Sequence, residues 1–273
     1  MAPTLARRAS ATRPAAVAGA FYPDDPGELA ATVDRLLERA RRYAGPAPKA
    51  LVVPHAGYVY SGAIAASGYA CIVPSAQRLR HVVLFGPAHR VPVHGCALPG
   101  ASSFATPLGS VPVDVDLAAR LAELPGVTTS ARAHQLEHSL EVQLPFLQRI
   151  LPSFTVLPIA VGYAEPSDVA NVLDAAWGDA STLVVISSDL SHYLPYADAC
   201  SIDRATAERI VDLDVRPLDQ HEACGATPVS ALLIAARRRG LGATLVDLCN
   251  SGDTAGSRDQ VVGYGAFAFH PLS

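Results

Sequence analysis

The sequence predicts an α/β fold in a single domain, with a mainly parallel central sheet and helices on both faces. Three observations predict it. Helical and strand patterns alternate along the chain, as they do in α/β proteins. Predicted strands such as Ala50–Val53 are apolar at every position, which is typical of strands buried on both faces of a parallel sheet. The chain has 273 residues, 50% of them hydrophobic, which is enough to bury a sizeable core.

The first half of the chain begins with a clearly marked helix. Asp25-Pro26-Gly27-Glu28 supplies a cap, a proline at the first helical position and a glutamate three residues after the cap. Apolar residues follow at helical spacing, so we expect one face of this helix to pack on a core. The next elements are expected at Ala50–Val53 (strand), Ala63–Ile72 (helix), His81–Phe85 (strand), and Gly95–Thr106 and Val111–Val115 (short strands).

The second half continues the alternation without an internal repeat. We expect helices over Glu137–Ile150, Ser167–Trp177, Asp203–Leu213 and Pro228–Arg239, and strands over Phe154–Val161, Thr182–Ser187, Ala243–Leu248 and Val261–Phe269. No linker in the sequence is long enough to separate two domains. Residues 13–273 are therefore expected to form one domain, after a disordered N-terminal tail at residues 1–12.

The composition argues against several classes of protein. A net charge of -4 and a pI near 6.1 argue against a nucleic-acid-binding surface. No run approaches the roughly 18 apolar residues that a membrane helix needs, and no apolar core follows the first arginines as in a secretory signal. The five cysteines are widely spaced without a C-x-x-C pair, which favours reduced thiols. We therefore expect a cytoplasmic protein without nucleic-acid or membrane partners.

Four predicted strands end in side chains that can bind a metal or carry a proton. The stretch "ALVVPHAGYVYSG" presents His55 directly after its apolar run, and "HVVLFGPAHR" presents His89. The stretch "TLVVISSDLSHY" ends in Asp189 and His192, and "TLVDLCNSGDT" ends in Asp253. If these strands lie side by side in a parallel sheet, the side chains meet at one edge, where open α/β sheets bind their ligands.

A further polar group lies in "LEHSLEVQLPF". Glu137 and Glu141 are like charges four residues apart on a helix, which is mildly destabilising, and His138 lies on nearly the same face as Glu141. We expect His138 and Glu141, together with Cys224 of "CGATPV", to line a substrate pocket. The alternative is an exposed polar face, because acidic residues at a helix start also suit the helix dipole.

The residue types at these strand ends point to metal chemistry. The sequence contains no G-x-S-x-G elbow, no Walker loop and no G-x-G-x-x-G behind a strand. Two or three histidines plus a carboxylate most naturally bind a divalent metal. Imidazole suits iron, zinc and copper, and two histidines with one carboxylate and open positions are typical of non-haem Fe(II) oxygenases.

With these motifs the sequence resembles the MEMO family. The resemblance rests on seven stretches between Arg13 and Phe269, in family order and spacing: "RPAAVAGAFYPDDPGEL", "VPHAGYVYSG", "LFGPAHR", "EHSLEVQLPF", "ISSDLSHY", "CGATPV" and "NSGDTAGSRDQVVGYGAFAF". The family is similar in fold to class III extradiol dioxygenases, which open catechol-type rings with Fe(II) and oxygen. Its bacterial and archaeal members accompany AMMECR-type and radical-SAM proteins (the AmmeMemoRadiSam system), which the resemblance implies as partners.

The resemblance also implies roles for individual residues. His55 and His89 match the two metal-binding histidines of the family, and His192, with Asp189 beside it, matches the acid/base histidine of the related dioxygenases. Animal members have a cysteine as third ligand shortly before the last strand, and counting back from "VVGYGA" that position is Thr254 here. We expect Asp253 to replace it; Cys249 and Cys224 are alternatives, and Asp189 could itself be a ligand.

Three functions are compatible with these residues. The first is an Fe(II)-dependent dioxygenase-type enzyme acting on an aromatic or other chelating substrate. The second is a metal-handling or protein- and peptide-binding module that keeps the pocket without oxygen chemistry. The third is a zinc hydrolase on the same ligands, since zinc-bound water has a pKa near 7. The bound metal, for which iron, zinc and copper are the candidates, would separate the first function from the third.

Overall fold

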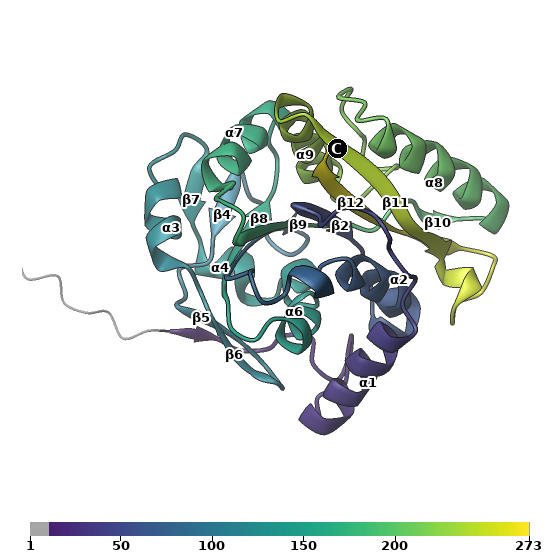
Figure 1. Ribbon diagram of the computed structural model, residues 1–273, viewed down its shortest axis with the longest axis horizontal. Coiled ribbons are helices and arrows are strands. Elements are labelled where there is room, and N and C mark those ends of the chain that lie inside the picture. Colours follow the sequence, from purple (N-terminus) through teal and green to yellow (C-terminus); the bar gives the residue numbers. More distant parts are fainter. Residues whose placement is uncertain (1–10, 273) are drawn as a thin grey trace, which may run out of the picture.

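A large sheet runs through the middle of the protein (Figure 1). The structure, a computed structural model, describes residues 11–272. The sheet has nine strands in the order β10-β12-β2-β9-β3-β8-β4-β7, with β11 paired to β12 on the other side. The strands are β2 (Ala50–Val53), β3 (His81–Pro87), β4 (Cys96–Leu98), β7 (Val127–Thr129), β8 (Thr155–Val161), β9 (Thr182–Ser187), β10 (His192–Leu194), β11 (Leu241–Asn250) and β12 (Val261–Pro271).

The centre of this sheet is parallel. Strand β9 pairs in parallel with both β2 and β3, and β3 pairs in parallel with β8. The flanks are mixed, because β12 is antiparallel to β2 and β4 is antiparallel to β8. The predicted α/β fold with a parallel centre is therefore confirmed. Since parallel strands end at the same edge, β2, β9 and β3 deliver the residues that follow them to one place.

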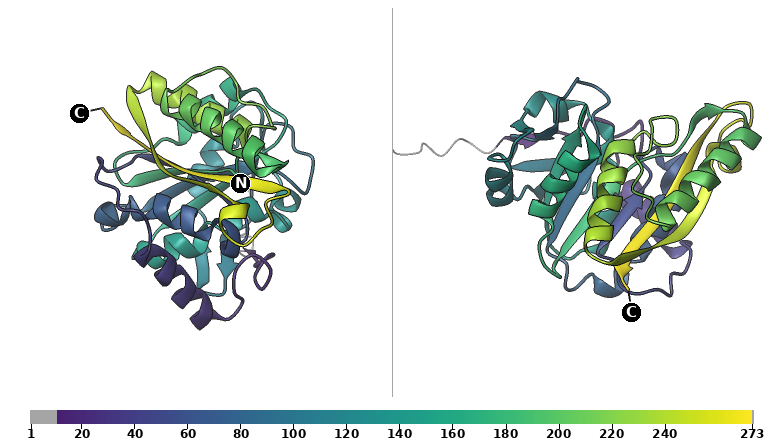
Figure 2. Two further views of the ribbon diagram at one scale, coloured as in Figure 1. Left: turned by 90° about the vertical axis from the view of Figure 1, so that its right-hand side faces the viewer. Right: turned by 90° about the horizontal axis from the view of Figure 1, so that it is seen from above.

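Helices cover both faces of the sheet, as predicted. Figure 2 shows α8 and α9 on one side of the strands and α1 and α2 on the other. The longer helices are α1 (Pro26–Glu38), α2 (Tyr58–Ala70), α7 (Pro166–Ala176), α8 (Tyr196–Val211) and α9 (Ala226–Arg238). The shorter ones are α3 (Val115–Leu121), α4 (Ala131–Gln135), α5 (His138–Glu141) and α6 (Leu144–Ile150), with 3-10 turns η1 (Val73–Ser75) and η2 (Ser251–Asp253). Within residues 11–272, no helix has the length and apolar character needed to cross a bilayer.

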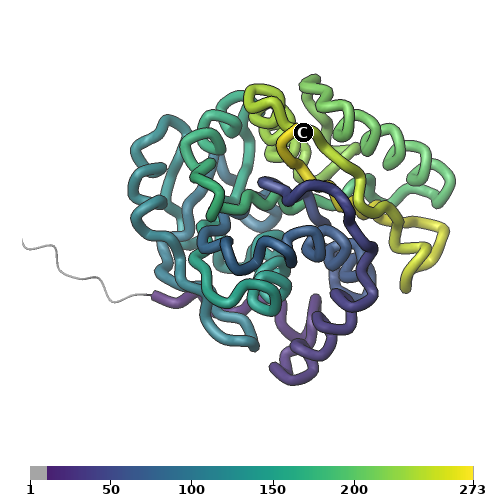
Figure 3. Tube along the Cα trace, viewed as in Figure 1, coloured from purple at the N-terminus to yellow at the C-terminus, as the bar shows by residue number. Residues whose placement is uncertain are grey.

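The beginning of the described chain belongs to a second, small sheet. Strand β1 (Thr12–Arg13) pairs in parallel with β5 (Ser103–Thr106), which pairs with β6 (Gly109–Pro112). Most of the tail predicted at residues 1–12 lies outside the described residues, but Thr12 pairs with Ser103. Figure 3 follows the chain from this sheet to α1, the purple helix at the bottom of the view. The N-terminal strand thus brings Arg13 next to the region around α5.

Two local features match or modify the predicted helices. The side chain of Asp25 accepts a hydrogen bond from the Glu28 N–H, so α1 begins at the predicted cap. The helix predicted over Glu137–Ile150 is instead two helices, α5 and α6, because Pro145 lies in the first turn of α6 and has no N–H to continue the preceding helix. Helix α5 lies at the carboxyl end of β3, where the Ser139 hydroxyl donates a hydrogen bond to the Pro87 carbonyl at 3.0 Å.

Candidate metal centre

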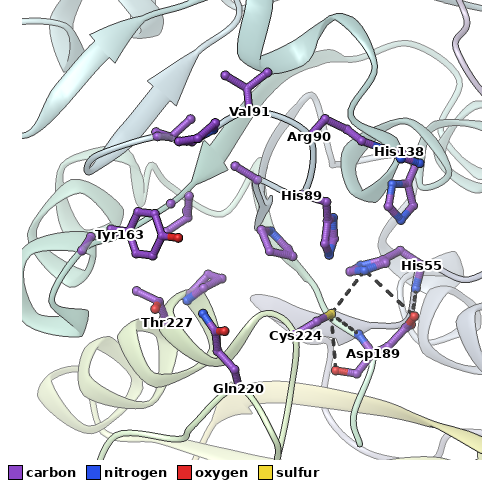
Figure 4. Close-up of a pocket in the computed structure, with 18 of the residues that line it drawn as sticks. His55, His89, Arg90, Val91, His138, Tyr163, Asp189, Gln220, Cys224 and Thr227 are labelled. Atoms are coloured by element: carbon purple, nitrogen blue, oxygen red, sulfur yellow. Dashed lines mark hydrogen bonds and ion pairs between the residues drawn. The ribbon is translucent and has the colours of Figure 1, made fainter. Parts of the chain in front are cut away.

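A cavity of about 1140 Å³ opens at the carboxyl ends of β2, β3, β8 and β9 (Figure 4). The segments that follow these strands line it, together with α5 and the start of α9. Its lining includes most of the predicted site residues: His55, His89, His138, Asp189, His192 and Cys224. The strand ends and α5 therefore converge on one site, which is where open parallel sheets bind their ligands.

His55, which follows β2, is buried at the bottom of the site. Its Nδ1 lies 2.9 Å from Ser187 Oγ. The Ser187 hydroxyl donates its single proton to the Ser139 carbonyl at 2.6 Å, so toward His55 it can only accept, and His55 Nδ1 carries the proton. Nε2 therefore has a lone pair, and it lies 3.3 Å from the Cys224 sulfur. Burial, and then the imidazoles of His89 and His138, hold the pKa of His55 well below its ordinary value, which keeps the ring neutral.

His89, which follows β3, is held by Glu137. Its Nδ1 donates to Oε1 of Glu137 at 2.9 Å, and its backbone N–H donates to Oε2 at 2.6 Å. Burial tends to raise the pKa of Glu137, but the hydrogen bond and charge of His89 and two backbone N–H groups together lower it to about 2. The carboxylate is thus ionised, and His89 is left with its Nε2 lone pair available on the other side of the ring.

The third histidine of the cluster is His138, the first residue of α5. One ligand atom from each of His55, His89 and His138 lies within 4.8 Å of the others. The rings of His89 and His138 are stacked with centroids 4.7 Å apart, and those of His55 and His138 meet edge-on at 5.4 Å. A side chain at Gly86 on β3 would meet Ser139 at 2.8 Å, so this glycine permits the close approach of α5. Burial lowers the pKa of His138 to about 4.

These three histidines fit a divalent metal. Imidazole nitrogens are ligands for iron, zinc and copper. At metal–nitrogen distances of 2.0–2.1 Å, two nitrogens on one ion are at most about 4.2 Å apart, so small rotations bring the three side chains onto one ion. The Nδ1 atom of His138 is buried and makes no hydrogen bond among the described residues, but Oε1 of Glu137 lies 3.4 Å from it.

His192 lies on β10 at the same cavity. Its Nδ1 lies 2.8 Å from the Leu190 carbonyl and must donate to it, so its Nε2 also has a lone pair. Burial lowers its pKa. Tyr193 has φ 57, a left-handed conformation that costs a non-glycine residue about 1–2 kcal/mol, and the pairing of β10 with β12 shifts register between His192 and Leu194. This bulge changes the direction of the chain at His192.

Asp189 and Cys224 lie together beside His55 (Figure 4). Asp189 Oδ1 accepts the backbone N–H of His55 at 2.7 Å, and Asp189 donates its own backbone N–H to the Cys224 sulfur at 3.3 Å. Burial raises the pKa of Asp189 to about 7, and burial followed by the Asp189 charge raises the pKa of the Cys224 thiol. Gly225 allows this approach, because a side chain there would meet Ser188 at 2.7 Å.

Two predicted site residues lie elsewhere. The Asp253 carboxylate accepts hydrogen bonds from Tyr196 Oη at 2.7 Å and from the Asn250 N–H at 3.2 Å, and Asp253 is not part of the cavity lining. The order β11–β12–β2–β9–β3 puts four strand spacings, roughly 19 Å at about 4.8 Å each, between the end of β11 and His89. Asp253 follows a strand that ends at the same edge of the sheet as β2 and β3, but it lies too many strands away to contact the histidines.

Glu141 is a buried structural carboxylate and does not line the cavity. Its side chain is 0% exposed and pairs with Arg13 of β1. It also accepts the backbone N–H groups of Ala16 at 2.8 Å and Val17 at 3.1 Å, and the hydroxyl of Tyr22. All of its hydrogen bonds thus tie the N-terminal segment to α5, and the structure does not bring Glu141 to the predicted pocket.

Sequence reasoning missed Glu137 and Ser187 as partners of the histidines. Glu137 precedes His138, but it contacts His89, which is 48 residues away in the sequence, so only the fold reveals the contact. The position of Ser187 at the end of β9 was the one available signal for the second partner. The outer wall of the cavity was also missed, and it includes Arg90, Tyr163, Gln220 and Thr227.

Comparisons with the sequences of known proteins agree over nearly the whole chain. The profile of the family described as "Memo-like protein" matches residues 13–268. A MEMO1 family protein of Aquifex aeolicus is 38% identical over 268 residues, which cover 92% of this chain and 97% of the relative. One from Methanopyrus kandleri is 34% identical over 280 residues, covering 94% and 98%. The crystal structure of an uncharacterized protein from Escherichia coli K12 aligns with a TM-score of 0.49 at 15% identity, covering 79% of this chain and 98% of that one.

Proposed function

The chain belongs to the Memo-like protein family, and from that premise and the geometry of its histidines we propose that it holds a non-haem metal ion, Fe(II), and catalyses a dioxygenase-type oxidation of an aromatic or other chelating substrate. One observation carries the proposal. His55, His89 and His138 cluster within 4.8 Å at the bottom of a large cavity, and the hydrogen bonds at Nδ1 leave Nε2 of His55 and His89 with a lone pair that can bind a metal. Such preorganised lone pairs favour metal binding.

The neighbouring groups suit proton transfer. When bound, Fe(II) would supply the redox chemistry between oxygen and a chelating substrate. Neutral His192, with its Nε2 lone pair in the cavity, would accept a proton from a substrate hydroxyl. Asp189, whose pKa is raised to about 7 by burial, would exchange protons near neutral pH. Its carboxylate also fixes the backbone of His55, so it positions a ligand as well.

Metal analysis and oxygen uptake test the proposal together. Protein purified without oxygen is analysed for metal, loaded with Fe(II) and followed with an oxygen electrode in the presence of catechols. We expect close to one iron per chain and oxygen uptake that depends on substrate. His55→Ala should lose the iron, whereas the control His270→Ala should keep it, because His270 contacts Thr244 and Pro271 and does not line the cavity. Protein that binds iron and stays inert with a broad set of chelating aromatics would instead support a binding module.

The position of Cys224 favours a second candidate, a zinc hydrolase. Its sulfur lies 3.3 Å from His55 Nε2, close enough for both atoms to bind one ion, and a thiolate ligand favours zinc or copper. Zinc-bound water would then be the nucleophile, with Asp189 as the proton acceptor. Zinc in the purified protein, together with ester or amide hydrolysis that needs no oxygen, would favour this candidate over the oxygenase.

A further inference from the structure

We infer that Glu137 is a positioning residue of the proposed centre, which fixes the ring orientation and the tautomer of His89 and thereby sets the affinity for the metal. The contact of Glu137 with His89 is independent of any metal, and the effect on affinity rests on the proposed function. Glu137 does not line the cavity, so it acts through His89 and not on a substrate. Nothing in the sequence pattern around Glu137 assigns it this role.

The first argument is that one carboxylate holds His89 at two points. Oε1 accepts from the ring at Nδ1, and Oε2 accepts from the backbone N–H of the same residue. The side chain of Glu137 is 0% exposed, so water does not compete for these hydrogen bonds. Two bonds from one rigid group fix both the backbone and the rotation of the ring about its side-chain bonds. His89 is therefore held with Nε2 directed away from Glu137.

The second argument is the choice of residue. Glu137 is the N-cap of α5, with φ -78 and ψ 123, and its carboxylate accepts the Ser139 N–H at 3.0 Å. Asp, Asn, Ser and Thr are the residues preferred at N-caps, because their short side chains reach back to the helix. A glutamate breaks this rule, and its extra methylene lets the carboxylate span the cap and the loop after β3 together. Positions that break a local rule with a compensating contact are typical of functional sites.

The third argument is the position of Glu137 between two imidazoles. Oε1 lies 2.9 Å from Nδ1 of His89 and 3.4 Å from Nδ1 of His138, whose ring is stacked on that of His89. The negative charge favours a proton on the nitrogen of each ring that faces it. The nitrogen on the opposite side of each ring is therefore unprotonated and has a lone pair for a metal. A carboxylate that accepts a hydrogen bond from a histidine ligand also raises the basicity of that ligand.

Glu137→Asp separates the two roles of this carboxylate. Aspartate is a good N-cap, so α5 and the stability of the metal-free protein should be kept, but the side chain is one methylene too short to hold His89. The first measurement is the nitrogen NMR spectrum of the histidines in metal-free protein. We expect the wild type to show His89 with its proton on Nδ1, and Glu137→Asp to show a mixture of tautomers. The second measurement is the competition of Fe(II) and Zn²⁺ with a chelator, for which we expect a 10–100-fold loss of affinity.

A matched control and a second variant complete the experiment. Glu165 is also a glutamate at an N-cap and lines the same cavity, but its side chain makes no cap hydrogen bond, so Glu165→Asp should change neither the spectrum nor the affinity. Glu137→Gln keeps the length of the side chain but turns an NH₂ group toward an N–H donor, so we expect a loss in the same direction. An unchanged His89 tautomer in folded Glu137→Asp and Glu137→Gln overturns the inference, as does unchanged affinity. Wild-type protein that binds neither metal refutes the proposed function alone, because the spectrum still tests Glu137.

Discussion

Replacing Glu141 by glutamine tests whether this carboxylate supports the fold or the substrate pocket. The side chains of Glu141 and Arg13 are 0% and 5% exposed, and the carboxylate accepts four hydrogen bonds: from Arg13, Ala16, Val17 and Tyr22. Glutamine removes the charge and replaces one accepting oxygen with an NH₂ group, which cannot accept a hydrogen bond. Some of the four donor groups would then be left without an acceptor. Breaking a buried ion pair by removing one partner costs about 3–5 kcal/mol. For a domain of this size the midpoint of thermal unfolding should fall by roughly 6–20 °C.

The assay is thermal and urea unfolding of metal-free Glu141→Gln, followed by circular dichroism, with metal binding measured well below the midpoint. We expect the loss of stability with metal stoichiometry kept, because no hydrogen bond of Glu141 reaches a histidine of the cluster. Glu38→Gln on the surface of α1 is the control and should unfold like the wild type. Unchanged stability of Glu141→Gln, or a loss of metal or activity without a loss of stability, would refute the structural assignment.

Three further predictions concern histidines. His55→Ala or His89→Ala should abolish stoichiometric Fe(II) binding while circular dichroism stays native-like; full metal content in either variant contradicts the proposed ligands. His192→Gln should keep the iron and lower turnover about 10²–10⁴-fold, the usual share of general acid–base catalysis, whereas loss of iron would make His192 a ligand. His134 is buried, its Nε2–H donates to the Ala97 carbonyl, and burial lowers its pKa from 6.5 to about 4. As the pH falls from 6.5 to 4, the unfolded chain takes up a proton at His134 that the folded protein does not. The free energy of unfolding of the metal-free protein should therefore fall by up to about 3 kcal/mol over this range. In urea unfolding, His134→Gln should lack this contribution to the dependence of stability on pH.

The central strands could be predicted from the sequence because burial on both faces leaves a continuous apolar run. The bounds of β2 and β9 coincide with the predicted Ala50–Val53 and Thr182–Ser187, and β3 extends the prediction by two residues, to Pro87. His55, His89 and Asp189 follow these strands, so the convergence of the three residues at one edge of the sheet could be predicted too. The short elements could not: β7 has three residues and α4 has five, which is too short for a period to be visible.

The third member of the histidine cluster could not be predicted, because it depends on lateral distance within the sheet and on how closely α5 packs against β3. Asp253 follows a strand at the correct edge but too many strands away, and the sequence alone contains no strand order. His138 comes close because α5 packs on Gly86 of β3. Cys224 comes close because Gly225 lets the start of α9 approach the end of β9. Each of these contacts joins segments that are far apart in the sequence.

The partners of Nδ1 suggest how the three strand-end histidines divide the proposed chemistry. His89 donates to a carboxylate, His55 to a serine hydroxyl and His192 to a backbone carbonyl. A carboxylate that accepts the Nδ1 proton raises the basicity of an imidazole more than a neutral oxygen acceptor does. His89 should therefore contribute most to metal affinity. His192 lacks an anionic partner at Nδ1 and its pKa is lowered by burial, so it enters a reaction as a neutral base that accepts a proton before it donates one. Turnover should therefore rise with pH through the ionisation of His192, below its ordinary pKa of 6.5, and His192→Gln should remove that limb of the pH profile.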